Sequence, residues 1–269
     1  MAIFLILLSL IFASDKKEDK SNLVKVNIIQ SDRNHQNEDI YLLFQLNIKD
    51  LWHTYWRNPG DSGLPTNIKI ETQDNVKVSE IIWPEIPEKI PFDDLANFGF
   101  SDQQNLIIKI SPDNEEKELN LKAKISWLVC KEECIPQDTT ISLNIPYHMD
   151  MKISKKDTEN TTLINNLIAN QPKKKDISYT SAKIDGDYVV LESQDDFFKI
   201  YDAELSFFAF EGGYYSNSIE PEITRSNNLY QIKFKLDDYK IDNPNNINGL
   251  FVVSKDDKRT AFEVNIPIN

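Results

Sequence analysis

Two runs of alternating apolar and polar residues flank the two cysteines of the chain. Ahead of the first cysteine, every second position from Leu121 to Val129 is apolar, and behind the second one Ile141, Leu143 and Ile145 continue the alternation. This period of two is typical of a β-strand with one buried face. Only residues 131–133 separate the cysteines, so the pattern predicts a β-hairpin with a short loop. The loop contains no Gly for a left-handed position, and its turn type stays open.

The hairpin fixes which residues lie opposite one another. If Cys130 faces Cys134, the same register brings together three apolar pairs: Val129 with Ile135, Ala123 with Ile141, and Leu121 with Leu143. Because successive side chains of a strand point to opposite faces, both sulfurs then lie on the other face of the hairpin, with Lys122, Lys124, Thr140 and Ser142. Paired Cα atoms at ~4.5–5.5 Å are within reach of a disulfide. We therefore expect Cys130 and Cys134 to be close, accessible and joined in an intramolecular disulfide.

Three uses of this cysteine pair are open. A structural bridge across so short a loop would stabilise the fold by only about 2 kcal/mol, whereas an exposed short-loop disulfide suits thiol–disulfide exchange. Two soft sulfur ligands could also bind Cu(I), with help from His53. Because His53 forms no recognisable metal spacing with His35 or His148, we assign no metal ligand and no cofactor.

The N-terminal residues are typical of a secretory signal peptide. Residues 2–13 are apolar, and a passable cleavage site follows, so we expect a signal peptide over residues 1–14. The segment lacks Lys and Arg, and an apolar strand is the alternative. It is too short to span a bilayer, so the mature chain is expected to be soluble, not membrane-spanning, and in an oxidising compartment. The net charge of −13 argues against nucleic acid as a partner.

Turn signals divide the rest of the chain into two sets of short strands. Their spacing of roughly ten residues predicts an all-β fold of two β-sandwich domains. The predicted order is a flexible leader (15–22), a first domain (23–148), a linker with a short helix at about 158–170 (149–176), and a second domain (177–269). The second domain lacks Cys, Trp and His, so the chemistry is expected in the first. Its aromatic cluster between Phe207 and Tyr215 is either core or interface.

Two aromatic segments accompany the cysteines in the first domain. The segment 51–66 carries two tryptophans, Tyr55 and the Pro-Gly and Ser-Gly steps of tight turns. Three prolines between Pro84 and Pro91 predict an extended connection, and Phe98 and Phe100 flank Gly99 in the loop expected after it. These phenylalanines can cap a reactive site or pack in the core, and both readings stay open.

With these residues together, the chain resembles the periplasmic N-terminal region of the thiol:disulfide interchange protein DsbD family, in particular its ScsB-like branch. The matching motifs are Trp-His-Thr-Tyr-Trp-Arg-Asn-Pro-Gly-Asp-Ser-Gly-Leu-Pro at 52–65, Phe-Gly-Phe at 98–100, and Trp-Leu-Val-Cys to Cys-Ile-Pro at 127–136. Similarity continues more weakly into the second domain.

The resemblance implies a fold and a set of roles. It implies two immunoglobulin-like domains, with Cys134 as the cysteine that enters mixed disulfides and Cys130 as the resolving one. It also implies that Phe98 or Phe100 belongs to a loop that shields the pair, and that Trp56 and its neighbour Tyr55 line the same site.

The implied partners are thioredoxin-like periplasmic proteins and a membrane-embedded DsbD/ScsB-like reductase. Full-length members of the family carry a multi-helix membrane domain and usually a thioredoxin-like domain with its own Cys-x-x-Cys. These 269 residues contain neither, so we expect a periplasmic protein-disulfide reductase-type relay that works with separate partners.

Overall fold

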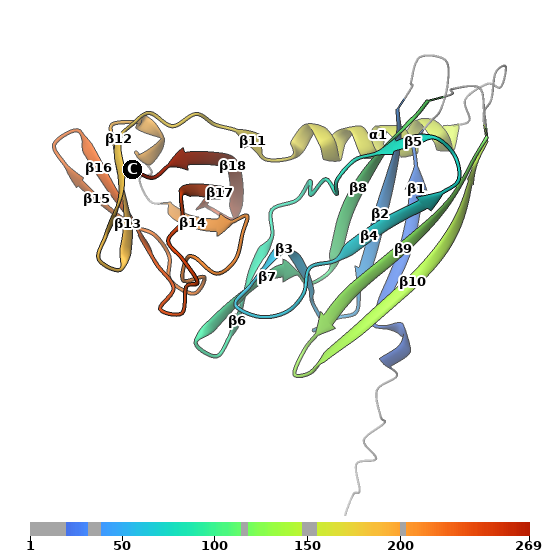
Figure 1. Cartoon of the computed structure of the whole chain (residues 1–269), viewed down its shortest axis with the longest axis horizontal. Helices are drawn as coiled ribbons and strands as arrows, with labels where there is room; N and C mark the ends of the chain where they lie inside the picture. The colour runs from blue at the N-terminus through green and yellow to red at the C-terminus, as the bar shows by residue number, and fades with distance from the viewer. Residues whose placement is uncertain (1–19, 32–38, 114–117, 147–154, 200–202) are drawn as a thin grey trace, which may run out of the picture.

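The computed structural model describes residues 20–31, 39–113, 118–146, 155–199 and 203–269, which form two β-sandwiches with a small sheet between them (Figure 1). The predicted signal peptide lies outside the described residues. Of the predicted leader, only the end is described, and Lys20–Asn22 form a 3-10 helix, η1.

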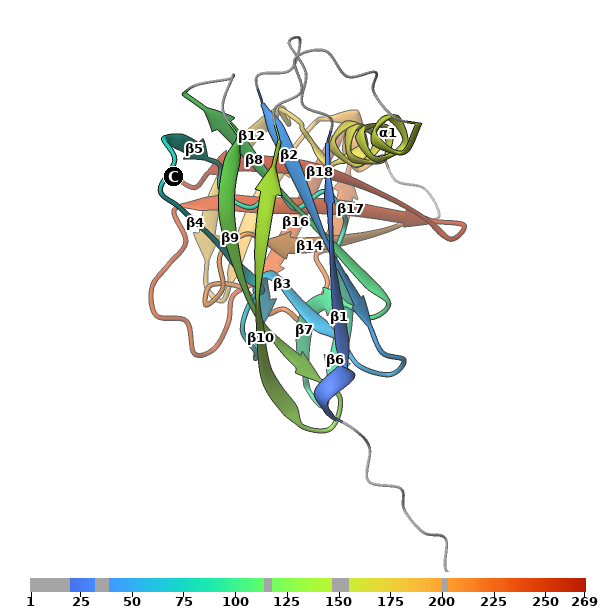
Figure 2. The same ribbon diagram turned by 90° about the vertical axis from the view of Figure 1, so that its right-hand side faces the viewer.

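Seven strands make the N-terminal sandwich. One sheet has the order β1 (Val24–Gln30), β2 (Ile40–Ile48), β8 (Gln103–Pro112) and β5 (Val76–Val78). The other has the order β10 (Cys134–Ile145), β9 (Leu119–Cys130) and β4 (Asn67–Thr72). The alternating apolar residues of β9 are all buried and share one core with β2 and β8. Figure 2 shows β1, β9 and β10 on one side of the molecule, with the β9–β10 turn at the same end as η1.

The helix of the predicted linker packs on the N-terminal sandwich. Helix α1 (Lys155–Asn170) covers the outer face of the first sheet, where Ile164 is fully buried with Leu43 and Ile107. The end of the linker also belongs to a sheet, because β11 (Lys173–Lys174) pairs in parallel with β18 (Lys258–Pro267). The domain boundaries themselves stay a prediction.

Eight strands make the C-terminal sandwich. One sheet has the order β11, β18, β17 (Asn246–Lys255) and β14 (Glu204–Ala209). The other has the order β12 (Tyr179–Asp185), β13 (Tyr188–Ser193), β16 (Leu229–Lys235) and β15 (Glu222–Ser226). A short 3-10 helix, η2 (Asp196–Phe198), follows β13. The core is aromatic: the rings of Phe207, Phe234 and Phe251 contact one another at centroid distances of 5.2–5.8 Å.

A small sheet of β3 (Thr54–Gly60), β7 (Leu95–Phe100) and β6 (Glu88–Phe92), here called the bridging sheet, lies between the two sandwiches (Figure 1). The chain after Pro84 is extended, as predicted, and part of it forms β6, but the loop predicted at Phe98–Phe100 is wrong because these residues belong to strand β7. Residues 96–100 of β7 are buried on both faces, so the strand lacks the period-two pattern. Gly99 allows the close pairing with β3, since a Cβ there would lie 2.0 Å from the Thr54 carbonyl oxygen.

The two sandwiches share continuous packing. The core of the N-terminal sandwich extends to four buried residues of the C-terminal sandwich, Phe208, Leu250, Val252 and Ala261. On β14, Phe207 faces its own core while the next residue, Phe208, faces the N-terminal core. The aromatic cluster is therefore core and interface at once, because successive strand residues face opposite sides.

Candidate functional site

The two cysteines form a disulfide at the turn end of the β9–β10 hairpin. Cys130 ends β9 and Cys134 begins β10, with their Cα atoms 4.2 Å apart. The three predicted apolar pairs lie opposite one another in the observed register. The predicted pairing, loop length and intramolecular disulfide are thus confirmed in this structure.

The two sulfurs differ in exposure. Cys134 is exposed, but Cys130 is only 2% exposed, so the prediction that both are accessible is wrong for Cys130. Strand β4 pairs with β9 only as far as Ser126. Beyond it the chain around His53 takes the place of β4, with backbone hydrogen bonds of 2.9 Å in both directions between His53 and Cys130. This pairing brings the start of β3 over Cys130.

Tyr55 is the side chain that contacts the sulfurs. Its hydroxyl donates a hydrogen bond of 2.9 Å to Cys130 Sγ and lies 3.8 Å from Cys134 Sγ. The side chain is 1% exposed, and this burial raises the pKa of the phenol, so the hydroxyl keeps its proton at neutral pH. A protonated phenol beside Cys130 can stabilise negative charge on that sulfur.

His53 lies on the same side of the chain as Tyr55. Its Nε2 is 3.3 Å from the Tyr55 hydroxyl, and the two rings meet edge to face at 5.2 Å. Burial lowers the pKa of His53, which favours the neutral imidazole. From the sequence His53 is expected to be a packed or exposed histidine rather than a metal ligand, and its contact with Tyr55 was not predicted. The signal was present in the two-residue spacing, which places side chains on the same face of a strand.

The other predicted site residues lie in the core. Trp56 and Phe98 are 1% and 0% exposed, and both pack against Phe208, at ring distances of 6.3 and 4.7 Å. Phe100 is 5% exposed and also belongs to the N-terminal core. The loop expected to carry the phenylalanines is strand β7, so the structure corrects that placement. Along β3, Tyr55 faces the disulfide and Trp56 faces the C-terminal sandwich.

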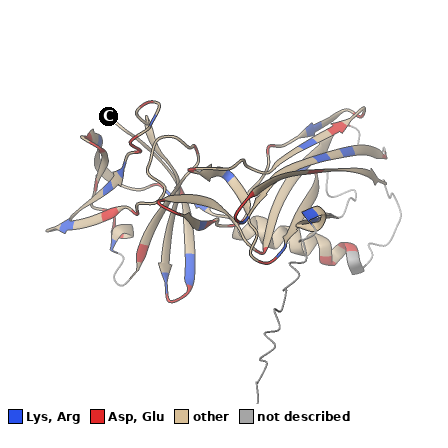
Figure 3. Ribbon diagram, turned by 90° about the horizontal axis from the view of Figure 1, so that it is seen from below, with Lys and Arg blue, Asp and Glu red and all other residues tan. Residues whose placement is uncertain are grey.

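Charged residues surround the disulfide without forming a single-sign patch. The hairpin loop is exposed, and its Glu133 forms an ion pair with Lys20 of η1. Figure 3 shows acidic and basic residues distributed over both sandwiches.

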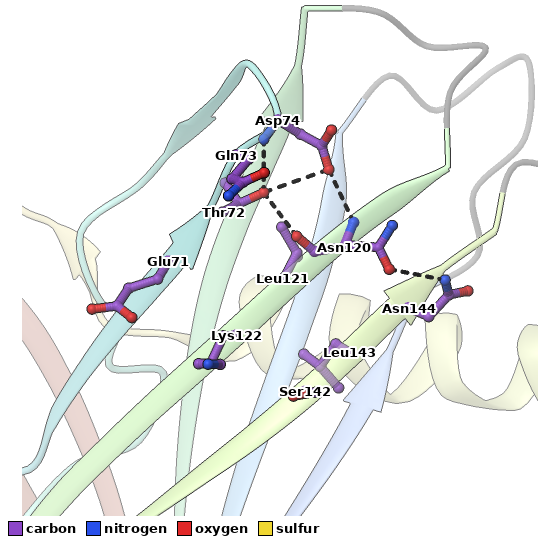
Figure 4. A pocket seen from close by; sticks show the side chains of 10 residues that line it. All are labelled: Glu71, Thr72, Gln73, Asp74, Asn120, Leu121, Lys122, Ser142, Leu143 and Asn144. Carbon is purple, nitrogen blue, oxygen red and sulfur yellow. Dashed lines mark hydrogen bonds between the residues drawn. The ribbon is translucent and has the colours of Figure 1, made fainter.

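A shallow pocket lies at the opposite end of the hairpin (Figure 4). Hydrogen bonds connect residues that line it, from Thr72 to Asp74, from the Asn120 backbone to Asp74, and between the Asn120 and Asn144 side chains. About ten strand residues, or roughly 33 Å, separate these asparagines from the cysteines. The pocket is thus too distant to take part in chemistry at the disulfide.

Two further properties concern the described residues alone. No three or more His, Cys, Asp or Glu side chains gather there in a metal-binding arrangement. Within the same ranges, no helix combines the length and apolar character that a membrane crossing requires.

Comparison with known proteins shows which sequences and structures the chain is similar to. Residues 23–146 match the family model described as the N-terminal part of the thiol:disulfide interchange protein DsbD. The N-terminal periplasmic domain of ScsB from Proteus mirabilis is similar in structure, with a TM-score of 0.62 and 20% identity over 91% of this chain and 93% of that chain. This likeness shows the expected fold of two immunoglobulin-like β-sandwiches. No curated protein sequence matches the chain.

Two other solved structures match only distantly. The yeast GGA1 GAE domain has a TM-score of 0.28 and 11% identity over 46% of this chain and 94% of its own. The periplasmic chaperone SfaE has a TM-score of 0.27 and 9% identity over 90% of this chain and 98% of its own. Neither value is high enough to inform the fold.

Proposed function

We propose that this chain, whose residues 23–146 belong to the family of DsbD N-terminal domains, is a periplasmic thiol–disulfide exchange protein that relays electrons through Cys130 and Cys134. The observation that carries the proposal is the asymmetry of the disulfide. Cys134 is open to solvent, whereas Cys130 is buried beneath a hydrogen-bond donor. A structural bridge needs neither feature.

The asymmetry assigns an order to the reaction. A partner thiolate attacks the exposed Cys134 Sγ and forms a mixed disulfide, while the Cys130–Cys134 bond breaks and Cys130 leaves as a thiolate. The Tyr55 hydroxyl, 2.9 Å from Cys130 Sγ, stabilises the charge that develops there. The second thiol of the partner then attacks the mixed disulfide and releases Cys134. The partner leaves oxidised, and the chain has gained two electrons.

The reverse direction passes the electrons on. The Cys134 thiolate attacks a disulfide in an oxidised protein, and Cys130 attacks the resulting mixed disulfide at Cys134, which restores the bond between them. Because the Tyr55 hydroxyl donates its hydrogen to Cys130 Sγ, a protonated His53 Nε2 can donate to the phenol oxygen and so support that hydrogen bond. Both half-reactions balance with the partner's dithiol and disulfide alone, so no cofactor is needed.

The proposed electron donor is a membrane-embedded DsbD/ScsB-like reductase, and the proposed acceptors are thioredoxin-like periplasmic proteins. Thioredoxin-like proteins carry a reactive Cys-x-x-Cys pair, which fits attack on an exposed Cys134. The support comes from the family match and from the exposure of that sulfur.

Trapping with single-cysteine variants tests the proposal. A thioredoxin-like protein that lacks its second active-site cysteine is first converted to a mixed disulfide with a small aromatic thiol. This activated protein is then mixed with the Cys130→Ser variant and, separately, with the Cys134→Ser variant. We expect a covalent complex with Cys130→Ser, mapped to Cys134 by mass spectrometry, and little with Cys134→Ser. Equal trapping of both variants would contradict the assigned order, and trapping of neither would contradict exchange.

A further inference from the structure

Strand β3 and the turn after it link the disulfide to the C-terminal sandwich. Tyr55 near the start of β3 contacts Cys130 Sγ, and Asn58 near its end donates a 2.8 Å hydrogen bond to the Ala209 carbonyl oxygen of β14. Asn58 is only 2% exposed. The chain then turns through Gly60–Gly63, which we call the β3 turn, and returns toward the Tyr55 ring.

Gly63 forms the first contact of this turn. The glycine has a φ of +97°, and a Cβ added to it would lie 2.2–2.7 Å from three ring carbons of Tyr55. The backbone of Gly63 therefore lies directly against the ring. Because the ring is buried, it cannot move aside without displacing the turn.

Asp61 forms the second contact, to the C-terminal sandwich. Its Oδ1 accepts a 2.7 Å hydrogen bond from Asn217 Nδ2, and its Oδ2 accepts one of the same length from the Ala96 backbone N–H. Asn217 is 7% exposed, and its neighbour Ser216 is held by a 2.9 Å backbone hydrogen bond to Lys235 of β16. The turn is thus fixed from one side by β7 and from the other by the C-terminal sandwich.

We propose that Asn217 and Gly63 are positioning residues for the disulfide, and that holding Tyr55 over Cys130 is a role of the C-terminal sandwich. Asn217 holds Asp61, the β3 turn holds the Tyr55 ring through Gly63, and the ring keeps its hydroxyl on Cys130 Sγ. This inference deepens the proposed function, since it concerns the same sulfur. Its test below needs no exchange reaction, so the two can fail separately.

The exposure of Cys130 measures the position of Tyr55. In the Cys134→Ser protein, Cys130 is the one remaining thiol. Its rate of alkylation by iodoacetamide measures how often the Tyr55 side chain moves away from Cys130 and exposes the sulfur. Adding Asn217→Ala should raise this rate about tenfold, which corresponds to about 1.4 kcal/mol and to the low end for a hydrogen bond to a charged group. An unchanged rate would overturn the proposal.

The same loop offers a matched control. Glu220, three residues after Asn217, forms a 2.5 Å ion pair with Lys89 of β6 and so crosses the same interface without touching the β3 turn. Glu220→Gln in the Cys134→Ser background should leave the alkylation rate of Cys130 within about twofold of its parent, since exposed ion pairs contribute little. An equal rise with both variants would show general loosening of the interface and would overturn the proposal.

A double-mutant cycle separates a path through Tyr55 from a merely structural effect. With Tyr55→Ala already present, the cover is gone, and adding Asn217→Ala should change the alkylation rate by less than about twofold. A second full tenfold rise would mean that Asn217 acts by another route. Urea unfolding of each variant verifies that the alkylated protein is folded.

A second measurement uses the chain with its disulfide intact. Tetranitromethane nitrates exposed tyrosines, and peptide mass spectrometry resolves Tyr55 from the other tyrosines. We expect Asn217→Ala and Gly63→Ala each to speed nitration of Tyr55 by about tenfold, with Glu220→Gln unchanged. An equal nitration rate of Tyr55 in all three variants would overturn the proposal, even if the proteins in the Cys134→Ser background failed to fold.

Discussion

Replacing Tyr55 with Phe removes one hydroxyl and keeps the ring that covers Cys130. The lost group is the 2.9 Å donor to Cys130 Sγ, and the side chain is fully enclosed, so water cannot readily take its place. The substitution therefore separates the two effects of this residue, steric cover and hydrogen bonding. We expect slower reduction of the disulfide in the variant, because the leaving Cys130 thiolate has lost its donor.

The size of the effect follows from the charge on the sulfur. A hydrogen bond to a charged group contributes about 1.5–3 kcal/mol, and about half of the thiolate charge has developed in the transition state of exchange. The barrier should rise by about 0.7–1.5 kcal/mol, so the rate should fall about three- to tenfold. In the reduced protein the charge is complete, and the pKa of the Cys130 thiol should rise by about one to two units.

The assay is the second-order rate of reduction by dithiothreitol at pH 7, with the Cys130 pKa read from thiolate absorbance in the Cys134→Ser background. Tyr215→Phe is the matched control, since Tyr215 is also buried and donates one hydrogen bond, of 3.1 Å, to the Asn246 carbonyl oxygen. We expect no change in its reduction rate. A Tyr55→Phe rate equal to that of the parent, or an equal fall in the control, would refute the role given to the hydroxyl.

Three other outcomes are expected. Phe98→Ala should lower the free energy of unfolding by about 3–5 kcal/mol and leave reduction by dithiothreitol nearly unchanged; faster reduction at an unaltered urea midpoint would instead reveal a shield. Burial lowers the pKa of His53 below its ordinary 6.5, so the imidazole is protonated in the unfolded chain at a higher pH than in the folded one, and the free energy of unfolding falls as the pH drops below about 6.5. His53→Gln should reduce the fall of the urea midpoint below about pH 6.5. Identical pH profiles of the midpoint in the variant and its parent would argue against burial of a neutral imidazole. A segment of residues 173–269 has its own aromatic core and should unfold cooperatively in urea, which a broad, probe-dependent transition would disprove.

The alternation around the cysteines predicted the hairpin to the residue. Strands with one buried face keep a period of two, and in β9 and β10 this pattern fixed both register and pairing. The helix predicted at about 158–170 also lies within a few residues of the observed start of α1. Local patterns were sufficient wherever an element has one buried side.

The bridging sheet and the burial of Cys130 could not be predicted in this way. Strand β7 is enclosed by both sandwiches, so it shows no alternation, and the prolines before it suggested a loop. Cys130 is covered because His53, distant in sequence, pairs with it after β4 has ended. Contacts of this kind depend on the assembled fold, and a single sequence carries no local trace of them.

The reduction potential of the Cys130–Cys134 disulfide distinguishes an exchange-active bond from a structural one. The protein is equilibrated with dithiothreitol or glutathione buffers of known potential, and the oxidised fraction is measured by thiol labelling. Because Cys134 is exposed and Tyr55 stabilises the reduced Cys130, we expect a potential above about −300 mV, in the range of exchange-active disulfides. A potential well below that value, with no reduction by a thioredoxin-like dithiol, would mean that the disulfide is a structural bridge.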